Sequence, residues 1–374
     1  MKQFIYNLLF LLSLNATFSQ SKELILRESY EVDENTTLEI DIDNVSIVFE
    51  ESKDNKVHLD YTIQFSKDSE DIMYRVYEGI NAKAFKKNNS IKIDVKNSML
   101  LGELYSLDVN IETYKEHIRG IFKRRKENKY FYKSKDSIFE EIKFSIGSDT
   151  NDYFKKLKLE NPNKDYGRLG RRFKQHFIIK VPRNLKIKIK ALHSTFNFTF
   201  DVESNLDVSA FKTYFKFKNL RNKKHKFKLT KGIFQAEKIL GGNYNFKDIL
   251  KVRIGSIEKV ILKSENSKIQ VGQVKENVAI TDYDSKIDLF NFSNRFKGFN
   301  FKGEYSKLGL YKVKNQTYAM NVLGYNTVLN LDDNKTTFGD SKEKKLTKIL
   351  EKKPKKNSLN KINIELKNGI LNIK

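Results

Sequence analysis

Apolar and polar residues alternate along most of this chain with a period of two, which is typical of β-strands with one buried face. The alternation is clear over 36–49 and returns at 57–63, 90–95, 107–111 and from 177 onward. In the first half only residues 69–84 carry a helical pattern. Between 112 and 175 the alternation is lost. The pattern therefore predicts an all-β protein that contains a long inserted loop.

Beyond residue 177 a short motif recurs, in which a small or polar residue is followed by apolar residues at the second and fourth places. Its first residues are Ser194, Thr213, Gly232, Asp248, Ser267, Ser285, Ser306 and Asn326. Their mean spacing of about 19 residues is near the short end of the repeat lengths found in solenoid proteins. Strands this short cannot bury an apolar face alone, so successive repeats must stack. The repeat predicts a β-solenoid resembling a parallel β-helix.

Stacked coils would align equivalent residues of successive repeats. Ile269, Ile287, Leu308 and Val328 are expected in one interior column, with Lys268, Lys286 and Lys307 in a column outside. The alternative is a meander of hairpins that closes into a sandwich. Turn dipeptides such as Asn-Gly are scarce within the repeats, which favours the solenoid. The single Asn368-Gly369 pair stands between two alternating segments and predicts a C-terminal hairpin.

These patterns divide the chain into six parts. They are a signal peptide (1–20), an N-terminal, mostly antiparallel β-region (21–110), a basic insertion (111–176), the solenoid repeats (177–331), a basic linker (332–357) and a hairpin cap (358–374). The first part has a basic start, a short apolar core and small residues near Ser19, which is the pattern of a secretory signal. Its apolar run is shorter than the roughly 18 residues that span a bilayer. We therefore expect export to the periplasm, the cell envelope or the medium.

The chain resembles a family of exported bacterial β-repeat proteins named "putative auto-transporter adhesin, head GIN domain", whose function is unknown. The resemblance rests on the signal peptide, on the strand at 38–40, on the entry Ile179-Lys180-Val181-Pro182, and on repeats such as Tyr305-Ser306-Lys307-Leu308. It covers most of 30–110 and 177–331. Family members usually have glycine where this chain has Ser194, Thr213 or Ser285. The resemblance implies a β-repeat fold and an adhesive or structural role, and supplies no catalytic residues.

Charge adds a candidate function, because the formal net charge is +24 and its distribution is uneven. Residues 1–110 sum to −7, whereas 177–330 sum to +17. A positive field attracts anionic glycans, lipopolysaccharide phosphates or nucleic acid, although export argues against nucleic acid. A Lys-rich surface can also simply protect strand edges from aggregation. The candidate binding residues are Lys123, Arg124, Arg125, Lys126, Arg168, Arg171, Arg172, Lys268, Lys286 and Lys307.

The sequence offers little for catalysis. It contains no cysteine, so neither a disulfide nor a cysteine-linked lipid anchor is available. The five histidines are scattered without metal-ligand spacing, and neither a phosphate-binding glycine loop nor a Gly-x-Ser-x-Gly elbow occurs. Asp282 and Asp284 could form a carboxylate pair, but are expected to be solvated loop acids. We predict no catalytic residues, no metal and no cofactor, and keep a polysaccharide lyase-type β-helix enzyme acting on acidic glycans as the alternative.

Overall fold

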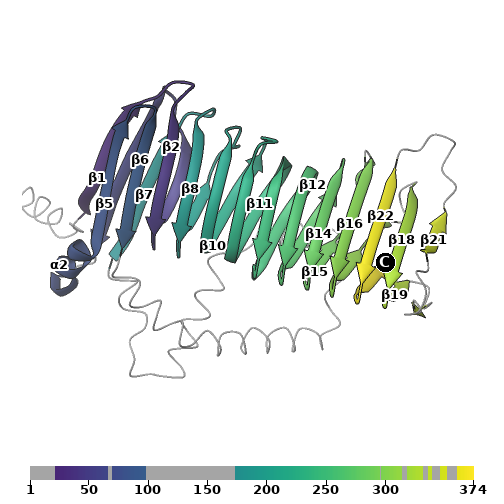
Figure 1. Cartoon of the computed structure of the whole chain (residues 1–374). Coiled ribbons are helices and arrows are strands. Elements are labelled where there is room, and N and C mark those ends of the chain that lie inside the picture. Colours follow the sequence, from purple (N-terminus) through teal and green to yellow (C-terminus); the bar gives the residue numbers. More distant parts are fainter. Residues whose placement is uncertain are drawn as a thin grey trace, which may run out of the picture.

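The computed structural model describes residues 22–65, 70–97, 173–294, 296–313, 318–331, 336–338, 346–351 and 360–374. Their strands belong to one hydrogen-bonded sheet of 23 strands (Figure 1). This confirms the all-β prediction. The expected signal peptide and most of the basic insertion lie outside the described residues.

The strands are β1 (Lys22–Glu31), β2 (Thr37–Asp43), β3 (Ser46–Glu51), β4 (Lys56–Phe65), β5 (Ile80–Lys87), β6 (Ser90–Asn97), β7 (Phe173–Val181), β8 (Lys186–Leu192), β9 (Thr195–Phe198), β10 (Leu206–Leu220), β11 (Lys226–Lys247), β12 (Lys251–Glu265), β13 (Lys268–Val274), β14 (Val278–Tyr283), β15 (Lys286–Leu289), β16 (Gly298–Glu304), β17 (Lys307–Leu310), β18 (Ala319–Tyr325), β19 (Val328–Leu331), β20 (Thr336–Phe338), β21 (Leu346–Glu351), β22 (Lys361–Lys367) and β23 (Ile370–Ile373). The helix α2 (Glu70–Gly79) confirms the start of the predicted helix, but ends earlier because β5 begins at Ile80.

Parallel pairing arranges most of these strands in two columns. The first column contains β6, β2, β8, the start of β10, both ends of β11, the end of β12, and then β14, β16, β22 and β18. The second column contains β7, β3, β9, the end of β10, the middle of β11, the start of β12, and then β13, β15, β17, β23 and β19. We call one passage of the chain through both columns a coil, and these passages follow one another along the long axis (Figure 1). A shorter third ladder of parallel pairs joins Val202, Leu220, Ile239, Ile257, Val274 and Phe292.

The corner between the columns explains the sequence motif. A residue with positive φ comes first, such as Asn266 (φ 45°) or Asp284 (φ 56°), and the hydroxyl residue follows. The hydroxyl of Ser267 donates to the carbonyl of Glu265 at 2.8 Å, across the left-handed residue. It also accepts the backbone N–H of Ile249 from the preceding coil at 3.0 Å. The hydroxyl therefore satisfies corner groups that are buried, as buried backbone requires.

The interior is formed by the inward-facing residues of both columns, together with buried residues of the third ladder such as Ile239 and Ile257. Because coils stack in register, equivalent aromatic rings lie on one another. Phe196 stacks on Phe215 with ring centroids 4.8 Å apart, and Phe198 stacks on Phe217 at 4.7 Å. Burial of each of these side chains stabilises the folded state by roughly 1.5–3 kcal/mol. The chain has no disulfides, so its stability depends on this burial.

Antiparallel strands cover both ends of the columns. At one end β5 pairs with β6, and β4 pairs with β7 and β1; at the other end β21 pairs with β18, and β20 with β19. Residues 21–110 are thus only partly antiparallel, since β2 and β3 pair in parallel within the columns. The region expected as a linker, 332–357, contains β20 and β21. These antiparallel strands pair with the end strands of the columns, so the parallel ladders are not themselves the edges of the sheet.

The prediction of a hairpin at 358–374 is wrong. β22 lies in parallel between β16 and β18, and β23 lies in parallel between β17 and β19. The C-terminal segment is therefore a coil inserted between two coils that precede it in sequence. Asn368 has φ 51°, so the Asn-Gly pair occupies the corner between the columns and not a hairpin turn.

The predicted interior column is correct for Ile269, Ile287 and Leu308, which are register partners. It is wrong for Val328. In the second column the next partner of Leu308 is Leu371, and Leu371 pairs with Leu329. The motif begins one residue later there, because Asn326 is the left-handed corner residue and Thr327 is the hydroxyl that follows it.

Candidate binding face and polar sites

Of the ten candidate binding residues, Lys268, Lys286 and Lys307 are described by the structure. Lys123, Arg124, Arg125, Lys126, Arg168, Arg171 and Arg172 lie outside the described residues. The first three are brought together as expected: Lys268 pairs in register with Lys286, and Lys286 with Lys307. Their strands β13, β15 and β17 are adjacent in the second column, so roughly 4.8 Å separates neighbouring backbones.

Lys251 extends this line by one coil, since Val252 is the register partner of Ile269. We call Lys251, Lys268, Lys286 and Lys307 the lysine row. Sequence reasoning missed Lys251 because the motif placed Leu250 in the interior, whereas Leu250 is 58% exposed and Ile249 is buried. Asp248 and Val252 are one residue further apart than the equivalent residues Asn266 and Ile269. This extra residue was the signal that could have revealed Lys251.

The lysine row carries an electrostatic cost. Burial, and then the charge of Lys286, lowers the pKa of Lys268. The carboxylate of Asp288 opposes this shift, whereas Lys251 and Arg253 add to it. Like charges on directly neighbouring strands repel each other. A bound anion would favour the charged form of Lys268, so this part of the row can hold negative charge.

Asp288 supplies negative charge beside the row. Its buried carboxylate lies 3.6 Å from Nζ of Lys286 and accepts the hydroxyl of Tyr311 at 3.3 Å. Gly309 is its register partner on the next strand, and a Cβ at that glycine would come within 2.8 Å of the carboxylate. The pocket for Asp288 therefore depends on a residue without a side chain.

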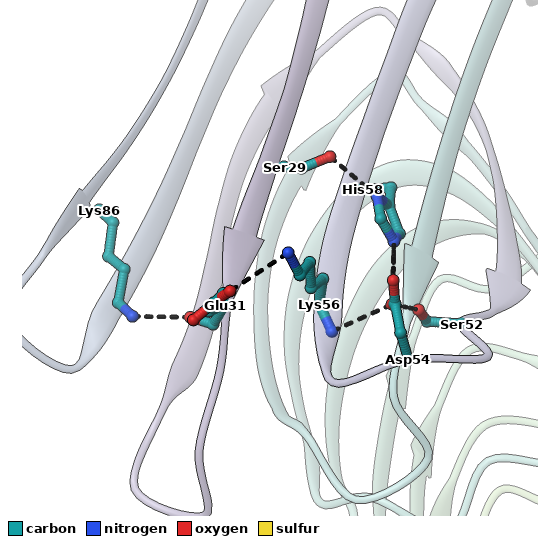
Figure 2. A network of polar contacts seen from close by, with 7 residues as sticks. All are labelled: Ser29, Glu31, Ser52, Asp54, Lys56, His58 and Lys86. Atoms are coloured by element: carbon teal, nitrogen blue, oxygen red, sulfur yellow. Dashed lines mark hydrogen bonds and ion pairs between the residues drawn. The ribbon is translucent and has the colours of Figure 1, made fainter.

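A second group of polar side chains connects β1 with β4 (Figure 2). The hydroxyl of Ser29 lies 2.8 Å from Nδ1 of His58, and Nε2 of His58 lies 2.9 Å from the carboxylate of Asp54. Ser52 donates to the same carboxylate at 2.6 Å. Hydrogen bonds from Ser52 and His58 lower the pKa of Asp54.

This group also joins a third strand through lysines. Nζ of Lys56 lies 3.2 Å from the carboxylate of Glu31, and Nζ of Lys86 donates to the Glu31 carbonyl at 2.6 Å (Figure 2). Ser29, His58 and Asp54 have the composition of a nucleophile relay, and their sequence positions gave no motif to find it by. The hydrogen bonds are exposed, whereas the electrostatic stabilisation of a reacting serine is strongest in a site shielded from bulk water. The arrangement is suited to joining strands at the covered end.

Asp282 and Asp284 do not form a carboxylate pair. Asp284 is the left-handed corner residue, whereas Asp282 is only 5% exposed and points into the coil. The Asp282 carboxylate accepts the hydroxyl of Ser264 and, at 3.1 Å, the backbone N–H of Ser285. The prediction that both are solvated loop acids is therefore wrong for Asp282, which is buried and hydrogen-bonded within the corner.

Among the described residues no group of three or more His, Asp or Glu side chains is arranged to hold a metal ion. No helix in the described part of the chain is long and apolar enough to cross a membrane.

No family model matches the chain, and no curated protein matches it in sequence. Among solved structures it is similar to a "putative cell adhesion protein" from Clostridium sporogenes, with 9% identity, a TM-score of 0.18, and 95% of this chain and 99% of that chain covered. It is also similar to a "putative adhesin" from Bacteroides fragilis, with 12% identity, a TM-score of 0.27, and 78% and 100% covered. At these identities and TM-scores neither likeness carries an argument about function.

Proposed function

We propose that the protein is an exported component of the cell envelope that binds anionic polymers through its lysine row, without catalysing a reaction. We further propose that the two strand columns are the walls of a β-solenoid, which would make the row a straight, repeating feature. Anionic glycans and the phosphates of lipopolysaccharide are the partners that fit such a surface and an exported protein.

The observation that carries the proposal is the register of the lysine row. Lys268, Lys286 and Lys307 occupy equivalent positions on adjacent strands. If lysines served only solubility, alternation with acidic partners would lower the repulsion between neighbouring strands. Nearby negative charge comes from Asp288, which is buried beside Lys286. The row thus favours an external anion.

The shape of the row favours a polymer over a small anion. Its members repeat at the spacing between strands, roughly 4.8 Å, along the axis of the columns. A single phosphate or carboxylate would contact one or two of them. A chain with regularly repeated negative groups can pair with all of them and release condensed counterions at each.

Binding to immobilised heparin and to lipopolysaccharide tests the proposal. The variant Lys268→Ser/Lys286→Ser/Lys307→Ser should elute at clearly lower salt than the wild type. The matched control is Lys186→Ser/Lys190→Ser/Lys228→Ser, which loses the same charge from exposed positions in the first column. Equal elution of the two variants would mean that only net charge matters, and would overturn a role for the row.

A further inference from the structure

A groove lies on the outer side of the first column, on different strands from the lysine row. Its larger part has a volume of ≈ 550 Å³ and is lined by residues that include Lys263, Thr281, Tyr283, Lys302 and Glu304. A second part of ≈ 360 Å³ adjoins it, sharing Thr281 and Lys302, and reaches Asn300. Volumes of roughly 300–1,000 Å³ are typical of ligand sites.

The register explains why this surface is hollow. The outward residues Ala279 and Thr281 of β14 are short. Thr281 lies between Lys263 of β12 and Lys302 of β16 as a register partner of both. Two residues earlier on β14, Ala279 lies between its register partners Ile261 and Asn300. The groove therefore follows β14, with the longer side chains of the two neighbouring strands as its walls.

The charges of the lining are nearly all compensated. Three glutamates have lysine partners: Glu265 with Lys247 at 2.8 Å, Glu304 with Lys367 at 3.0 Å, and Glu365 with Lys302 at 3.1 Å. Lys263, on the wall formed by β12, has no ion-pair partner within the described part of the chain. Asp282 also lines the groove, but its carboxylate is buried and accepts hydrogen bonds from Ser264 and from the backbone N–H of Ser285. Lys263 is therefore an exposed charge with which an anionic group could pair.

Aromatic rings stand at the end of β14. Tyr283 is 50% exposed and Tyr305 is 51% exposed, with their ring centroids 5.6 Å apart in an edge-to-face arrangement. Tyrosines in this position offer an apolar ring face together with a hydroxyl group. Thr281 and Asn300, which line the groove, add groups that hydrogen-bond hydroxyls.

We propose that this groove binds an oligosaccharide whose units carry carboxylates, such as a segment of a uronic acid polysaccharide. One ring packs against Tyr283, its hydroxyls bond Thr281 and its carboxylate pairs with Lys263. A neighbouring unit bonds Asn300, which is level with Ala279 and lies roughly 13 Å along β14 from Tyr283. This site lies in the first column, so it does not depend on the lysine row.

Titration of the full chain with tetragalacturonate, and separately with its methyl ester, isolates the charge of the ligand. Calorimetry should give tighter binding of the acid by about tenfold, the difference that a charge-assisted contact provides. Lys263→Ser should weaken binding of the acid by about tenfold and leave the ester unchanged. Tyr283→Ala should weaken the binding of both ligands. Lys228→Ser, an exposed lysine of the same column, is the control and should bind both ligands like the wild type.

Two results would overturn the proposal: no binding of tetragalacturonate at millimolar concentration, or equal binding of the acid by the wild type and Lys263→Ser. The triple variant of the lysine row separates the two proposals. It should keep its affinity for the tetrasaccharide while it loses retention on heparin. Loss of tetrasaccharide binding in that variant would place the sugar at the lysine row and not in the groove.

Discussion

The side-chain amide of Asn321 donates a hydrogen bond to Asn363 at 3.0 Å, although 42 residues separate them. Two further bonds have the same separation, from Asn326 to Asn368 at 2.9 Å and from Asn330 to Asn372 at 2.8 Å. The segments 321–330 and 363–372 thus share one asparagine pattern. Its hydrogen bonds join the inserted C-terminal coil to the coil formed by β18 and β19, which we call the outer coil. Asn363 also donates to Asn300 at 2.9 Å on the other side.

Asn363→Ala should therefore lower the free energy of unfolding by about 1–2 kcal/mol, because it removes one bond to each neighbouring coil. Urea denaturation gives the value. Asn243→Ala is the matched control, since Asn243 is an exposed asparagine of the same column, and its change should stay within about 0.5 kcal/mol. Equal changes in the two variants would show that the asparagine bonds do not hold the coils together.

Deletion of 361–374 should release the outer coil. β18 and β19 pair in parallel with β22 and β23, so they lose their connection to the column when those strands are absent. In repeat-like folds each unit is stabilised by its neighbours. Hydrogen exchange should therefore become fast over 319–331 while 206–265 remains protected. Continued protection of 319–331 would contradict the inserted arrangement.

The free energy of unfolding should fall in acid because His225 is buried in its neutral form. It is fully buried, and burial lowers its pKa to about 4. The backbone N–H of Leu206 approaches Nδ1 at 3.3 Å and that of Asn222 approaches Nε2 at 3.2 Å, so a protonated ring would place N–H groups against N–H groups.

Below about pH 6.5 the unfolded chain binds a proton at this histidine that the folded chain does not bind until about pH 4. Its contribution is therefore fully present above pH 6.5 and is lost between pH 6.5 and 4, by about 3 kcal/mol. The difference in unfolding free energy between wild type and His225→Gln should change over this window, because glutamine does not titrate. A constant difference would show that His225 is not buried neutral.

Incubation with uronic-acid polymers tests the proposal that the protein does not catalyse a reaction. We expect no unsaturated product, with or without calcium, when absorbance is followed. A calcium-dependent rise that purified wild type produces would instead establish the lyase alternative. The variant His58→Ala serves as a check on the exposed Ser29–His58–Asp54 group, and it should leave the absorbance unchanged.

Local pattern predicted the strands and the register of Ile269, Ile287 and Leu308, because period-two alternation and a recurring corner hydroxyl are encoded within each coil. It could not predict the place of 361–373, since the order of coils is decided by tertiary pairing and not by neighbours in sequence. The Asn368-Gly369 pair misled for the same reason: a left-handed conformation suits a coil corner as well as a hairpin. Of the candidate site, Lys268, Lys286 and Lys307 followed from the repeat, whereas Lys251 was displaced by the extra residue Leu250.

The salt dependence of heparin binding tests the role of the lysine row most directly. Each cation that pairs with the polymer releases a counterion, so the logarithm of the affinity falls linearly with the logarithm of the salt concentration. The variant Lys268→Ser/Lys286→Ser/Lys307→Ser should show a slope shallower by about 2–3 than the wild type, whereas Lys186→Ser/Lys190→Ser/Lys228→Ser should keep the wild-type slope within about 1. Identical slopes for wild type and the row variant would contradict the account.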